Sequence, residues 1–224
     1  MTGTTSLEQA RVTLRPLGSP LPLGILALLT ASVLLSTLEL HWIPTDQAHV
    51  IAIAVLALVV PLQALGCVFG LLTRDPVAAS GLGFLAGTWA VTSIALLTSH
   101  PGTTSPGLGV LLVTAAGAML VPAGGAATGT ALAAVVFVAA AARFAISGIY
   151  ELTGSSAWQH AAGVAGLVVA GIAVYAATAF ELEAALGRAV LPTLRHHQGR
   201  RAMSGRLADQ VERVAGEPGV RQQL

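Results

Sequence analysis

The chain has 224 residues, of which 54% are hydrophobic and only 9% are charged, and its formal net charge is +1. An ordinary soluble domain carries about 25% charged residues, so this composition argues against a soluble protein. A net charge so close to zero gives no reason to expect a nucleic-acid partner. The mean hydropathy of +0.79 points instead to a protein that lies in a lipid bilayer.

Six apolar runs, separated by short polar breaks, follow one another along the chain. A helix needs about 20 apolar residues to cross a bilayer core about 30 Å thick, and lipid offers no partner to open backbone groups, so each run is predicted to be helical. The predicted spans are 21–40, 50–72, 76–97, 108–122, 128–150 and 158–180. The segment 121–125 contains one proline and two glycines and is predicted to be a tight turn. The expected fold class is an all-α polytopic membrane protein with six transmembrane helices.

The charge distribution predicts how the chain crosses the membrane. Every basic residue is an arginine, and apart from Arg143 these arginines lie before the first span, between the second and third, and after the sixth. The positive-inside rule then places both termini in the cytoplasm, in a multi-pass protein of the inner (plasma) membrane. The predicted regions are an N-terminal cytoplasmic segment (1–19), a six-helix transmembrane domain (20–192) and an Arg-rich cytoplasmic tail (193–224).

The tail has a helical pattern of its own. Met203, Leu207, Val211 and Val214 recur at helical spacing, which favours an amphipathic helix lying on the membrane surface. The alternative is a solvated tail without regular structure.

Sequence signatures of catalysis are missing. The lone Cys67 excludes an internal disulfide. No set of His, Cys, Asp and Glu residues has the spacing of metal ligands, and no serine occupies a nucleophile elbow. We therefore expect a protein that is not an enzyme and that needs neither a metal nor another cofactor.

Arg143 is a charge inside the fifth predicted span, about seven residues or ~10 Å from its outer end. A charge at such a depth is costly and is a functional-site hypothesis by default. If Arg143 faces inward, with Ser147 one turn further out, the pair suits a small carboxylate. The structural alternative is that Arg143 reaches the interface or pairs with Glu151.

Other polar or bulky side chains lie inside the spans. The hydroxyl of Thr88 either lines a polar path or bonds its own backbone, and Trp89 lies too deep for an interface anchor, so it either packs or narrows a path. Glycines at helical spacing predict close helix packing. These glycines are Gly66 and Gly70, Gly83 and Gly87, and Gly163, Gly166 and Gly171.

Two segments resemble the acetate uptake transporter family, which contains bacterial succinate–acetate permeases and fungal acetate transporters. Residues 19–24 read SPLPLG, similar to the family's Asn-Pro-Ala-Pro-Leu-Gly signature, and residues 187–192 read GRAVLP, similar to its closing Gly-Arg-Thr-Val-Leu-Pro. Gly154, Gly163 and Tyr175 fit the family's last helix without a gap. The departures are Ser19 for the signature Asn, Leu28 for a common Phe, and an Arg143 that matches no family position.

The resemblance implies a six-helix transporter or channel for small monocarboxylates such as acetate, working down a gradient or by proton symport. It also implies a cyclic homo-oligomer, with a hexamer expected. The substrate path expected from the motif, the last helix and the polar residues together comprises Pro22, Leu23, Gly24, Leu28, Thr88, Trp89, Arg143, Ser147 and Tyr175.

Two other functions remain open. A conduit for a neutral solute, such as ammonia, urea or a short amide, suits the loss of bulky aromatics and the expected lack of a buried carboxylate. A scaffold or sensor acting through its tail suits the length of segment 193–224.

Overall fold

The computed structural model describes residues 18–195. Its helices form six apolar spans, each long enough to cross a membrane, as the sequence predicts. Five spans are single helices: α1 (Leu21–Glu39), α4 (Pro76–Thr98), α5 (Pro106–Ala127), α6 (Ala131–Thr153) and α7 (Ser156–Leu186). The second span is built from η2 (Thr45–Gln47), α2 (Ala48–Ala54), η3 (Val55–Val59) and α3 (Val60–Leu72). The predicted tail helix lies outside the described residues.

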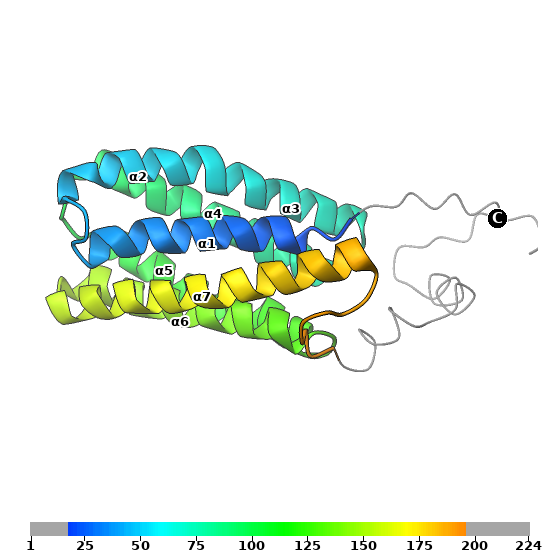
Figure 1. Ribbon diagram of the computed structural model, residues 1–224. Coiled ribbons are helices and arrows are strands. Elements are labelled where there is room, and N and C mark those ends of the chain that lie inside the picture. The colour runs from blue at the N-terminus through cyan, green and yellow to red at the C-terminus, as the bar shows by residue number, and fades with distance from the viewer. Residues whose placement is uncertain (1–17, 196–224) are drawn as a thin grey trace, which may run out of the picture.

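The spans run antiparallel in one elongated bundle (Figure 1). α1 packs along α7, α5 along α6, and α3 along α4. Residues 18 and 195 lie at the same end of the bundle, called the terminus end below, together with the α3–α4 and α5–α6 connections. The connections that follow α1, α4 and α6 lie at the other end, called the pocket end.

Local chemistry fixes where the helices begin and end. Prolines occupy the first turn of α1, α3, α4 and α5. Backbone N–H groups in the first turn have no partner within the helix, so the missing N–H of proline costs nothing there. The Asp75 carboxylate caps α4 by accepting from the N–H of Ala78 at 2.9 Å. α6 and α7 end at Gly154 and Gly187, both in the left-handed conformation with φ of 64°, which glycine adopts without steric cost.

The second span widens in its middle. Residues 55–59 form a π-helical turn that ends two residues before Pro61. Proline has no N–H, and its ring would clash with the carbonyl four residues earlier in a regular α-helix. The wider turn accommodates Pro61 without ending the span.

The predicted turn at 121–125 is wrong, because α5 continues through Pro122 to Ala127. In a bilayer an unpaired backbone is more costly than a helical proline, so the usual turn-forming residues do not end the helix there. The fourth span is consequently longer than predicted.

Glycines bring α5 and α6 into backbone contact. A β-carbon on Gly148 would lie 2.9 Å from the carbonyl oxygen of Gly109, and one on Gly109 would lie 3.0 Å from the carbonyl oxygen of Gly148. The pair thus permits a close crossing of the kind that small residues provide in membranes. The crossing positions α6, which carries Arg143.

Candidate functional site

A pocket opens at the pocket end of the bundle, and all six spans contribute side chains to it. Its volume is about 90 Å³, several times the 10–15 Å³ or so that a single water needs. Leucines and aromatic rings make up much of the wall, and its charged groups come from α1 and α6. The space suits a solute of only a few non-hydrogen atoms.

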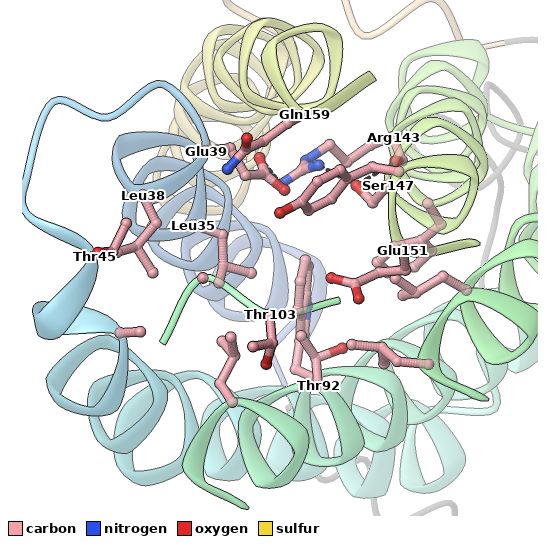
Figure 2. Close-up of a pocket in the computed structure, with 18 residues that line it drawn as sticks. Leu35, Leu38, Glu39, Thr45, Thr92, Thr103, Arg143, Ser147, Glu151 and Gln159 are labelled. Carbon is pink, nitrogen blue, oxygen red and sulfur yellow. Dashed lines mark hydrogen bonds and ion pairs between the residues drawn. The ribbon is translucent and has the colours of Figure 1, made fainter. Parts of the chain in front are cut away.

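Arg143 lines this pocket and is only 3% exposed. Its Nη2 donates to Glu39 Oε2 at 2.6 Å, and its Nη1 donates to the hydroxyl of Ser147. That hydroxyl donates in turn to the Arg143 carbonyl oxygen at 2.9 Å. Figure 2 shows the Glu39 carboxylate meeting the guanidinium from the α1 side, beside Ser147.

The ion pair bears on the two hypotheses for Arg143, a functional group that faces inward or a structural contact. Arg143 faces inward, and its acidic partner is Glu39 and not Glu151, so the predicted structural pairing with Glu151 is wrong. Both partners are largely buried, with Glu39 16% exposed. Removing either charge from such a pair leaves the other one uncompensated.

Glu151 enters the pocket from another side of α6 (Figure 2). Its Oε2 accepts a hydrogen bond from the backbone N–H of Ser105 at 2.7 Å. Ser105 is the N-cap of α5, where the helix dipole favours negative charge. The Glu151 carboxylate is therefore held by the start of α5.

Trp89 and Phe144 form an aromatic corner of the pocket wall. Their rings meet edge to face, with centroids 5.2 Å apart. Trp89 is 2% exposed, and its Nε1–H has no hydrogen-bond partner among the described residues. The residue therefore packs against Phe144 and lines the pocket.

The other residues of the expected path lie apart from this pocket. Pro22, Leu23 and Gly24 are at the terminus end of α1, where Pro22 and Gly24 are buried and Leu23 is partly exposed. Leu28 is buried in the core of the bundle.

Thr88 is also buried, and its hydroxyl donates to the carbonyl oxygen of Phe84 in its own helix. Tyr175 is 40% exposed on α7, and its hydroxyl donates to Pro192 O at 3.1 Å.

Several pocket residues were not anticipated as site residues. They are Glu39, Tyr150, Glu151 and Gln159, of which Glu151 was considered only as a structural partner. The signal for Glu39 was the charge on Arg143, since a buried guanidinium requires an acid nearby. Few acidic residues lie at those ends of the predicted spans that form the pocket end of the bundle, and Glu39 is one of them.

A polytopic all-α membrane protein with a small, partly polar pocket at one end of its bundle is the class that the fold and the site define. Among solved structures, this fold is similar to that of the bacterial acetate channel SatP, with a TM-score of 0.71 and 23% sequence identity. The match covers 80% of this chain and 99% of the channel's chain. The six-helix fold implied by the family resemblance is thereby confirmed.

Comparison of the sequence with protein-family models gave no match. Comparison with curated proteins also gave no match.

Proposed function

We propose that this chain is a membrane transporter or channel for small monocarboxylates of the size of acetate, with the pocket as the entry site of the solute. The main support is the fold, which follows that of an acetate channel over 99% of the channel's length. The six-span architecture also accounts for most of the described chain, as expected of a protein whose function lies within the bilayer.

The pocket chemistry supports the same proposal. Phe144 and the leucines of the wall offer apolar contact to a methyl or short alkyl group. The Nε1–H of Trp89, which has no partner among the described residues, is a donor for a carboxyl oxygen.

Buried polar groups continue from the pocket toward the terminus end, and we propose that they mark the path. Ser36 and Ser32 follow Glu39 inward along α1, and their hydroxyls have no hydrogen-bond partner among the described residues. Further inward, the fully buried Gln63 donates from Nε2 to the Gly24 carbonyl at 3.3 Å, while its Oε1 is unpartnered in the described chain. By helical rise, Glu39 and Gly24 are about 22 Å apart along α1, most of a bilayer core.

The experiment is uptake of labelled acetate into proteoliposomes, with and without a pH gradient, compared with protein-free liposomes. We expect uptake well above the protein-free background. Accumulation driven by the pH gradient above the protein-free background would indicate that acetate crosses together with a proton, either by symport or as the undissociated acid. Equilibration without such accumulation would indicate a channel for the acetate anion. Uptake no faster than the background under both conditions would contradict the proposal.

A second candidate is a conduit for a neutral solute such as urea or a short amide. The observation that favours it is the Glu39–Arg143 ion pair, because the protein itself balances the positive charge that an anion would seek. Urea flux in the same proteoliposomes, without acetate flux, would favour this candidate over the first.

A further inference from the structure

The charge balance of the pocket depends on one residue, Glu39. Its carboxylate lies 2.6 Å from Arg143 Nη2, within a pair whose side chains are 16% and 3% exposed. In such surroundings a charge–charge interaction is far stronger than in water. The guanidinium is therefore electrostatically satisfied before any solute arrives.

No second cation lines the pocket within residues 18–195. The lining side chains of α2, α4, α5 and α7 carry no charge, and the remaining ionisable groups are Tyr150 and Glu151 of α6. Glu151 accepts from Ser105 N–H and adds negative charge to the pocket. With both carboxylates ionised, two negative groups face one positive group, so the pocket does not attract an anion.

We propose that Glu39 is the residue that sets the charge of the transported species: by neutralising Arg143 it restricts the pocket to uncharged molecules, so that a monocarboxylate enters as the undissociated acid. The proposal rests on the proposed function. It also makes Glu39 a switch of selectivity. Removing its charge leaves the Arg143 guanidinium without its ion-pair partner, while Glu151 stays bonded to Ser105 N–H, so the guanidinium becomes free to attract an anion.

The test measures current and flux on the same preparations. Wild-type protein in planar bilayers should give no acetate current, although proteoliposomes take up labelled acetate. Glu39→Gln should give an acetate current that reverses at the acetate equilibrium potential, and should raise acetate flux relative to that of acetamide, its neutral analogue, about tenfold. Undissociated acid that leaks through lipid carries no current, so the bilayer does not contribute to the signal.

Two controls separate charge from general damage. Glu181→Gln removes a carboxylate from the exposed surface near the end of α7 and should behave as wild type. Glu39→Gln/Arg143→Gln leaves no fixed positive charge in the pocket and should again give no acetate current. Should Glu39→Gln fail to fold, Glu39→Asp keeps the charge but withdraws the carboxylate from Arg143, and a smaller acetate current is expected.

The outcomes distinguish this inference from the proposed function. An acetate current through wild-type protein, or a folded Glu39→Gln or Glu39→Asp that carries none, would overturn the role of Glu39 while leaving acetate transport in place. Absence of both acetate and acetamide flux from wild-type proteoliposomes would overturn the proposed function itself, and the inference with it.

Discussion

Gly166 of α7 leaves the space in which the Arg143 side chain lies: a β-carbon at position 166 would be 2.8 Å from Arg143 Nε and would collide with the Ser36 hydroxyl. Three helices, α1, α6 and α7, therefore meet at the guanidinium only because residue 166 has no side chain. The geometry of the guanidinium therefore depends on a small residue at position 166 as much as on its ion pair.

The first prediction follows from this contact. Gly166→Ala should displace the guanidinium and lower the free energy of unfolding by about 1–3 kcal/mol, the usual cost of overpacking. Gly171→Ala, on the same helix but with nothing within 4 Å of an added β-carbon, should unfold like wild type. Thermal unfolding in detergent checks both variants, and equal losses in the two would contradict the contact.

The ion pair predicts a coupling between two positions that are 104 residues apart. Arg143→Gln should lower stability by about 3–5 kcal/mol, because it leaves the Glu39 carboxylate buried without its partner. Adding Glu39→Gln should recover much of that loss. Adding Glu151→Gln instead should not, and unfolding of all the single and double variants measures the difference. Recovery by the Glu151 variant alone would refute the pairing.

Gly24 predicts a second-site rescue at the terminus end. A β-carbon on Gly24 would run into the side chain of Leu82 on α4, so Gly24→Leu should insert in the membrane but lose stability and flux. Leu82→Ala removes the obstructing atoms, and the double variant should regain part of both. If Leu82→Ala only adds to the loss, the clash is not the cause.

The segment after α7 predicts where truncation becomes harmful. Leu194 O accepts from the Ala131 N–H at 3.1 Å, at the start of α6, and Arg195 pairs with the buried Glu183 at 2.6 Å. A chain ending after Arg201 keeps these contacts and should retain acetate flux. A chain ending after Leu191 loses them and should be less stable. Loss of flux in the longer truncate would instead give the tail a direct role.

The predicted topology is tested by labelling from outside intact cells. In a Cys67→Ala background, Ser155→Cys at the pocket end should react with an impermeant thiol reagent, and Ser204→Cys should not. The reverse pattern would place the pocket on the cytoplasmic side and would invert the proposed direction of entry.

The spans were predictable because their apolar runs match the bilayer thickness, a property of each segment alone. The missed end of the fourth span has the opposite cause: Pro122, Gly124 and Gly125 indicate a turn in water, but a bilayer penalises the open backbone that such a turn needs. Local preferences learned from soluble proteins therefore fail within a membrane-spanning helix.

The site was only partly predictable. Arg143 was recognisable because a charge inside an apolar run is rare and costly. Its partner was not, because the pairing of Glu39 with Arg143 depends on which helices are neighbours, and a single sequence gives no measure of that. Helix packing also explains why Tyr175, expected in the substrate path, lies apart from the pocket. Its position matches the family pattern, but the packing of α7 leaves it partly exposed, beside Pro192.

The most direct test of the central claim, that small monocarboxylates cross the membrane by way of this pocket, is acetate uptake by a variant with a blocked entrance. Thr103 lies in the exposed α4–α5 connection and lines the pocket, so Thr103→Trp should fill the entrance and lower the protein-dependent flux at least about tenfold. Thr114→Trp, on an exposed face of α5, is the matched control and should transport like wild type. Equal acetate flux in the two folded variants would contradict the claim.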